Sequence, residues 1–116
     1  MSHEQSSAEP LEEVSLADFA RSAELLRALG APVRLALLHL LAPAPRCVHE
    51  LVDALGIAQP LVSQHLRTLR KAGLVVAARD GREVRYQLAD QHVAHIVQDA
   101  LVHAGEGLVG DTAGGS

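Results

Sequence analysis

The fold is decided by the stretch Gln59-Pro-Leu-Val-Ser-Gln-His-Leu-Arg-Thr-Leu-Arg-Lys-Ala-Gly-Leu-Val-Val-Ala-Ala-Arg-Asp-Gly-Arg-Glu-Val-Arg-Tyr-Gln-Leu88. The spacing of its apolar residues changes from helical to strand-like near its middle. In the first half, apolar residues recur every three to four positions, which predicts a helix from about 59 to 72. In the second half, residues 74–78 and 83–88 alternate around Asp80-Gly81, a strong signal for a β-hairpin. The stretch therefore predicts a helix followed directly by a hairpin.

A shorter helix is expected just before this stretch. It is predicted from about 47 to 55, and Gly56 is expected to end it. Two helices joined by about three residues that include a glycine have the spacing of a helix-turn-helix. A hairpin directly after such a motif is a wing. We therefore predict a mainly α (α+β) fold, a winged helix-turn-helix with a two-stranded wing.

Three further helices complete the prediction of five. Ser15 and Asp18 form a capping pattern for a helix from about 15 to 29, and Pro32 suits the first turn of an apolar helix that follows Gly30. The last helix is predicted from about 91 to 104.

The domain boundaries follow from these helices. We predict a winged helix-turn-helix and dimerisation domain over residues 15–106. A flexible acidic tail is predicted at 1–14 and a disordered tail at 107–116.

The composition fits one modest domain. The 116 residues are 48% hydrophobic but only 2% aromatic, so the core must consist mainly of leucine, valine and alanine. The single cysteine excludes a disulfide framework within the chain. The sequence has neither an 18-residue apolar run nor a signal-peptide pattern. We therefore expect a cytoplasmic protein with no membrane partner.

The charge is distributed unevenly along the chain. The net charge is −4, with acidic residues concentrated in residues 1–24. Residues 59–85 contain six basic and two acidic residues, a local charge of +4. Because a polyanion responds to the local field, this segment favours a nucleic-acid partner.

The candidate DNA-binding residues are polar or basic residues of the predicted recognition helix and wing. Side chains of these types bind base edges and phosphates of double-stranded DNA. The candidates are Gln59, Ser63, Gln64, Arg67 and Arg70 on the helix, and Arg79, Arg82 and Arg85 on the hairpin.

Four residues of types that bind metal ions stand at the two ends of the last helix. Asp90 and His92 stand at its start, and His103 and Glu106 at its end. The histidines are eleven residues apart, so they point the same way but lie about 16 Å apart. Each end therefore offers half of a tetrahedral site. Two copies of the helix packed antiparallel in a homodimer would complete two identical four-ligand sites.

Five motifs together resemble the ArsR/SmtB family of metal-sensing winged-helix repressors. The resemblance covers about residues 16–106 and includes the spacing Asp-x-His-x10-His-x2-Glu in the last helix. It implies a homodimer that represses an operon in its apo form and leaves operator DNA when zinc binds. The motifs are Leu29-Gly-Ala-Pro-Val-Arg34, Cys47-Val-His-Glu-Leu51, Leu61-Val-Ser-Gln-His-Leu66, Leu69-Arg-Lys-Ala-Gly-Leu74 and Gly81-Arg-Glu-Val-Arg-Tyr86.

One departure from the family concerns a second metal site. Relatives that sense softer ions carry Cys-Val-Cys, where this chain has Cys47-Val48-His49. One thiolate and one imidazole weaken the case for arsenite or lead and leave zinc or copper open. Cys47 and His49 are therefore a candidate second site.

The identity of the ion and the class of protein leave alternatives. Two imidazoles and two carboxylates suit Zn2+, and Co2+ can take the same set. Ni2+ prefers more ligands, which His3 or His95 could supply. A winged-helix regulator without a metal switch is a further alternative. Four protein ligands close the site and no acid/base constellation accompanies it, so an enzyme with a small-molecule substrate is not expected.

Overall fold

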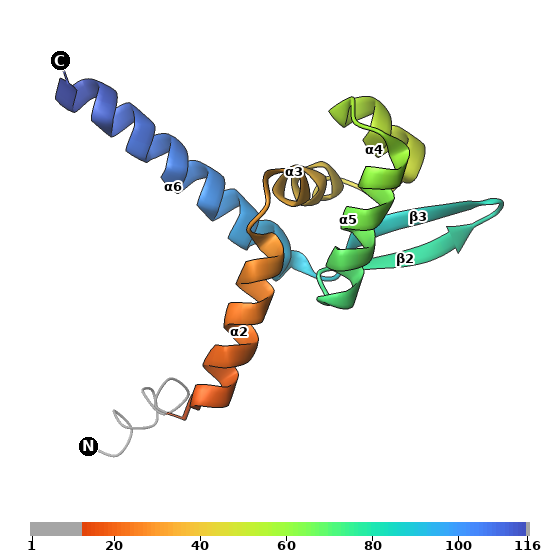
Figure 1. The fold of residues 1–116 in the computed structure, drawn as a ribbon, viewed down its shortest axis with the longest axis horizontal. Helices are drawn as coiled ribbons and strands as arrows, with labels where there is room; N and C mark the ends of the chain where they lie inside the picture. The colour runs from red at the N-terminus through yellow and green to blue at the C-terminus, as the bar shows by residue number, and fades with distance from the viewer. Residues whose placement is uncertain (1–12, 116) are drawn as a thin grey trace.

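The computed structural model describes residues 13–115 and the side chains of residues 13–106. Helices α3, α4 and α5 and the β-hairpin form a compact body, from which α2 and α6 extend as two arms (Figure 1). Most of the predicted N-terminal tail, including His3, lies outside the described residues. Within residues 13–115 the predicted winged helix-turn-helix with five helices is confirmed.

The helices and strands follow the predicted order along the chain. Their bounds are α2 (Leu16–Leu29), α3 (Pro32–Leu41), β1 (Arg46–Cys47), α4 (Val48–Leu55), α5 (Gln59–Lys71), β2 (Val75–Asp80), β3 (Glu83–Leu88) and α6 (Gln91–Gly115).

Local signals in the sequence account for several helix ends. Ser15 caps α2 in a capping box: its hydroxyl accepts from the Asp18 N–H at 3.2 Å, and the Asp18 carboxylate accepts from the Ser15 N–H at 3.0 Å. Gly56 ends α4 in the left-handed conformation, with φ of 68°. Pro32 stands in the first turn of α3, as predicted.

The core consists of leucine and valine, in agreement with the aromatic-poor composition. Helix α3 packs against α4, α5 and α6, and it contributes Leu37 and Leu38, both 0% exposed. Val93 and Val97 bring the first turns of α6 onto the same core. The buried side chains of α5 and its neighbours are Leu51, Val62, Leu66, Leu69, Leu74 and Val75. The recognition helix is therefore held rigidly by its apolar side.

Arg34 joins three helices near the start of α3. Its Nε donates to the backbone oxygen of Ala28 in α2 at 2.6 Å, and its Nη1 lies 3.4 Å from Nδ1 of His65 in α5. Hydrogen bonds from a charged guanidinium are stronger than neutral ones. Arg34 therefore helps to fix α2 and α3 against the recognition helix.

The sheet has one more strand than the sequence predicts. Its order is β1-β3-β2, and the short β1 pairs antiparallel with β3 through Arg46–Tyr86 and Cys47–Arg85. Residues Gly81 and Arg82 connect β2 to β3, and Gly81 has φ of 66°. A positive φ at the first central residue only is the pattern of a type II′ hairpin turn. Through β1, the wing is joined to the start of α4.

The last helix is longer than predicted. The expected end at 104 was wrong, because α6 continues through Gly105 to Gly115 and so runs through most of the segment assigned to a disordered tail. Gly105 is not among the glycines with positive φ, so it stays helical instead of forming a left-handed cap. The side chains of residues 107–116 lie outside the described part. Among the described residues, no helix is sufficiently long and apolar to cross a membrane.

Candidate functional site

Helix α5 presents a polar face beside its buried one. Val62, Leu66 and Leu69 are at most 1% exposed, whereas Gln59, Gln64, Arg67 and Arg70 are exposed and Ser63 is half-buried. The predicted DNA-binding side chains of this helix therefore lie beside its packed side or opposite to it. No carboxylate within residues 13–106 lies within ion-pair distance of Arg67 or Arg70. This face is a basic and hydrogen-bonding surface.

The wing adds two arginines to this surface. Arg79 lies near the end of β2 and Arg82 lies in the turn, and both side chains are exposed. In the described part of the chain, neither forms an ion pair. Their charges are thus available to the phosphates of a duplex.

Arg85 lies in a different environment from the other candidate DNA contacts. Its guanidinium lies 2.9 Å from Asp80, 3.6 Å from Glu50 and 3.6 Å from Glu83. The hydrogen bond to Asp80 is the main cause that raises the pKa of Arg85 above its usual value. Glu50 was not singled out by the sequence analysis. Its only signal in the sequence is the capping-box spacing Cys47-x-x-Glu50.

A hollow of about 350 Å3 lies between α4, α5 and the wing. It is lined by Gln59 and Ser63 of the recognition helix, by Arg82 of the wing, and also by Cys47 and His49. The Cys47 side chain is 8% exposed, and His49 is exposed. The candidate second metal pair therefore lies beside the candidate DNA contacts.

The first candidate ligand pair of α6 comes together at the start of the helix. Nδ1 of His92 lies 3.5 Å from Oδ1 of Asp90, and the side chains are 90% and 57% exposed. Oδ1 of Asp90 also accepts from the Val93 N–H at 3.2 Å, which confirms the predicted N-cap. This cap leaves the second carboxylate oxygen and the imidazole of His92 for a metal ion.

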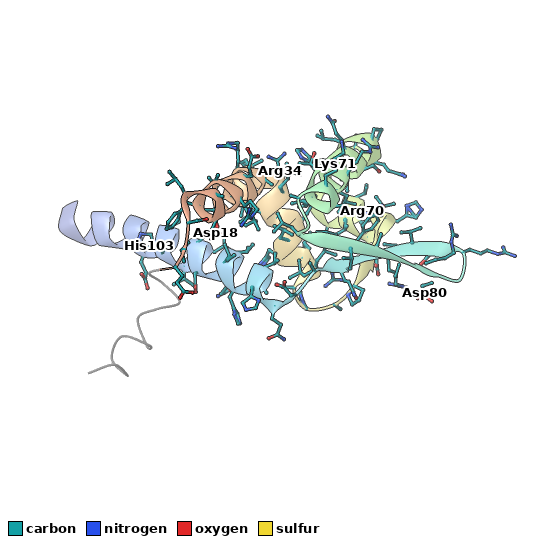
Figure 2. All side chains as sticks on the ribbon, turned by 90° about the horizontal axis from the view of Figure 1, so that it is seen from below. Asp18, Arg34, Arg70, Lys71, Asp80 and His103 are labelled. Carbon is teal, nitrogen blue, oxygen red and sulfur yellow. The ribbon has the colours of Figure 1, made fainter. Side chains whose placement is uncertain are left out.

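The second pair lies three turns further along the arm. His103 and Glu106 are exposed on α6, and His103 lies far from the wing residue Asp80 (Figure 2). Within residues 13–106 of one chain, no group of three or more histidine, cysteine or acidic side chains comes together as a metal site. One protomer thus presents two separate pairs of candidate ligands, with donor types that fit Zn2+ or Co2+.

The helix-turn-helix, its basic face and the hairpin together form a winged helix-turn-helix domain. The family model described as "Bacterial regulatory protein, arsR family" matches residues 31–76. The chain is 63% identical over 86 residues to the HTH-type transcriptional repressor SmtB of Mycobacterium tuberculosis. The matched residues span 74% of this chain and 64% of that repressor. The chain belongs to the arsR family of bacterial regulatory proteins, which confirms the resemblance seen in its motifs.

Two further relatives support this assignment. The HTH-type transcriptional regulator NmtR of Mycobacterium tuberculosis is 44% identical over 85 residues, covering 73% of this chain and 71% of NmtR. The homodimeric winged helix-turn-helix DNA-binding domain Mb0332 of Mycobacterium bovis superposes with a TM-score of 0.73 at 34% identity, covering 79% of this chain and 85% of that one. These relatives are regulators, in agreement with the prediction that the chain is not an enzyme.

Proposed function

We propose that this protein is a metal-responsive transcriptional repressor. Its apo homodimer binds operator DNA in the cytoplasm, and zinc at two intersubunit sites releases it. The observation that carries the proposal is the placement of two ligand pairs three turns apart on one arm. Asp90 with His92 and His103 with Glu106 are each half of a four-ligand site, and a second copy of α6 supplies the other half.

Exposed apolar side chains support the dimer. On α2, Leu16 and Phe19 are 83% and 58% exposed, and on α6, Leu101 and Val102 are each 45% exposed. Monomeric proteins rarely expose such groups together along two helices. Both helices extend from the compact body (Figure 1), so a second copy can cover them.

The donor set favours zinc, with cobalt as an alternative ion. Two imidazoles and two carboxylates fill a tetrahedral shell. Nickel prefers more ligands, and His95, exposed one turn after His92, is the described residue placed to add one. Metal binding to these ligands supplies a fixed link between the two copies of α6.

The switch acts through the packing of α6 on the DNA-binding body. Val93 and Val97 anchor α6 in the core that also holds Leu66 and Leu69 of the recognition helix. Four ligands from two chains fix the angle between the copies of α6, and each recognition helix moves with its own α6. The spacing of two recognition helices decides whether both fit successive major grooves. Thermodynamic linkage makes this coupling reciprocal. DNA must weaken zinc binding by the same factor as zinc weakens DNA binding.

The test begins with operator DNA selected from random duplexes by the apo protein. Zinc, cobalt and nickel are then titrated into complexes of this duplex with the wild type and with His103→Ala. We expect zinc to release the wild type but to leave His103→Ala bound. The matched control is His39→Ala, which removes an exposed histidine of α3 and should respond like the wild type. Release of His103→Ala by zinc would contradict the proposal.

A further inference from the structure

Arg85 connects three parts of the DNA-binding body. It lies on the central strand β3, opposite Cys47 of β1 and Ala78 of β2. Its Nε donates to Oδ2 of Asp80 at 2.9 Å, at the end of β2. Its Nη1 lies 3.6 Å from Oε1 of Glu50 in the first turn of α4. One guanidinium thus joins both long strands of the wing to the first helix of the helix-turn-helix.

Glu50 makes a second contact at the same place. Its Oε1 accepts from the Cys47 N–H at 2.9 Å, which caps α4 where β1 ends. This hydrogen bond is the largest cause that lowers the pKa of Glu50, and Arg85 adds to it. Both partners are therefore charged at neutral pH. Glu50 contacts the start of α4 and the wing together.

The charges around Arg85 argue against a direct contact with DNA. One guanidinium faces the three carboxylates of Asp80, Glu50 and Glu83, so the cluster has a net charge of −2. A phosphate approaching this cluster meets an arginine that is already neutralised. Arg79 and Arg82, in contrast, have no ion-pair partner within residues 13–106.

The base of the wing packs on the core through Val75, Tyr86 and Leu88, whereas residues 78–84 towards its tip are exposed. Strand β1 provides two residues, Arg46 and Cys47, for pairing with β3. Each partly exposed ion pair adds little to the stability of the fold. This cluster therefore matters more for the orientation of the wing than for stability. A small rotation of the hairpin about β1 would displace the arginines at its tip by a larger distance.

We propose that Arg85 and Glu50 form a clasp that sets the angle of the wing, and that Arg85 promotes DNA binding by this positioning and not by contacting phosphate. The proposal rests on the proposed DNA-binding function. It makes Glu50, an acidic residue, a positive contributor to the binding of a polyanion. Charge repulsion alone predicts the opposite effect on DNA affinity, because removing a carboxylate near DNA should strengthen binding.

The test measures binding of the metal-free full-length protein to random-sequence duplex DNA. We expect Glu50→Gln and Arg85→Gln each to weaken binding about three- to fivefold, the range of a coupled surface pair. The glutamine amide can still accept the hydrogen bond from Cys47, so α4 stays capped. The double variant should bind no more weakly than either single variant, because both remove the same clasp. Amide hydrogen exchange should accelerate in β1 and β3 and stay unchanged in α5.

Two controls separate the clasp from general charge effects. Glu24→Gln removes a carboxylate of α2, where it pairs with Arg27, and should not weaken binding. Arg70→Gln on the recognition helix should weaken binding additively with Glu50→Gln. Unchanged or tighter binding by Glu50→Gln, or additive losses with Arg85→Gln, would overturn the clasp alone. A wild type that does not bind duplex DNA would overturn the proposed function as well.

Discussion

Nδ1 of His92 lies 3.5 Å from Oδ1 of Asp90, and the same carboxylate oxygen caps α6 by accepting from the Val93 N–H. Asp90 thus combines a structural contact with its proposed role as a ligand. The two roles use different properties of the side chain, because any short oxygen acceptor can cap a helix, whereas the proposed zinc site needs the carboxylate.

Asp90→Ser and Asp90→Ala should therefore separate the two roles. Serine is also a good N-cap, so Asp90→Ser should keep the free energy of unfolding within about 0.5 kcal/mol, whereas Asp90→Ala should lose about 1 kcal/mol. Both variants should lose zinc affinity. Urea unfolding and competition with a zinc chelator measure the two quantities. Wild-type zinc affinity in Asp90→Ser would remove Asp90 from the site, and Asp99→Asn, on the same helix, is the control.

The stability of α2 should depend on pH through its capping box. Hydrogen bonds from the Ser15 N–H and hydroxyl are the main causes that lower the pKa of Asp18 below its ordinary value of 3.8. Because the folded pKa is the lower one, this stabilisation is fully present above 3.8 and is lost as the pH falls through the lowered pKa. Asp18→Asn should reduce the acid-induced drop in the free energy of unfolding.

Urea unfolding over a series of pH values between neutral and acid measures this effect. Asp99→Asn serves again as the control, because Asp99 forms no capping contact among the described residues. The wild-type curve should fall more steeply with acid than that of Asp18→Asn. Parallel curves for the two proteins would show that the capping box does not act through the ionised carboxylate.

The apolar face of α6 should be required for the dimer. Leu101 is 45% exposed, and an aspartate at this position would place a charge in the proposed interface. Leu101→Asp should sediment as a monomer, whereas Val76→Asp, which changes a 42% exposed valine of the wing, should remain a dimer. The monomeric variant should also bind zinc more weakly, because it lacks the partner's ligands. A dimeric Leu101→Asp would place the interface elsewhere.

Much of the fold could be predicted because its signals are local. Ser15 with Asp18, Pro32, Gly56 and the Asp80-Gly81 turn each act within a few residues, and the structure places an element boundary at each of them. The two-residue strand β1 has no such signal, since it exists only through its pairing with β3. The end of α6 was mispredicted because Gly105 tolerates a helix as well as a cap.

The candidate sites were predictable by residue type but not by environment. Arg82 and Arg85 look alike in the sequence, three residues apart on one hairpin. Only the structure shows that Arg85 faces carboxylates from β2, β3 and α4, because Glu50 is distant in the chain. The proposed zinc site differs in the opposite way. The spacing of its candidate ligands is visible in the sequence, but the described residues of one protomer bring no three of them together.

The proposed intersubunit site can be tested most directly by mixing two inactive variants. One variant carries Asp90→Ala with His92→Ala, and the other carries His103→Ala with Glu106→Ala. Neither homodimer has a complete site. A heterodimer isolated with two affinity tags combines the intact Asp90 and His92 of one chain with the intact His103 and Glu106 of the other.

Zinc stoichiometry and affinity of this heterodimer are the decisive measurement. We expect one tight zinc ion per heterodimer, with an affinity close to that of the wild type, and none in either variant homodimer. A heterodimer that binds no tight zinc ion, or a variant homodimer that still binds two, would contradict a site shared between the two copies of α6.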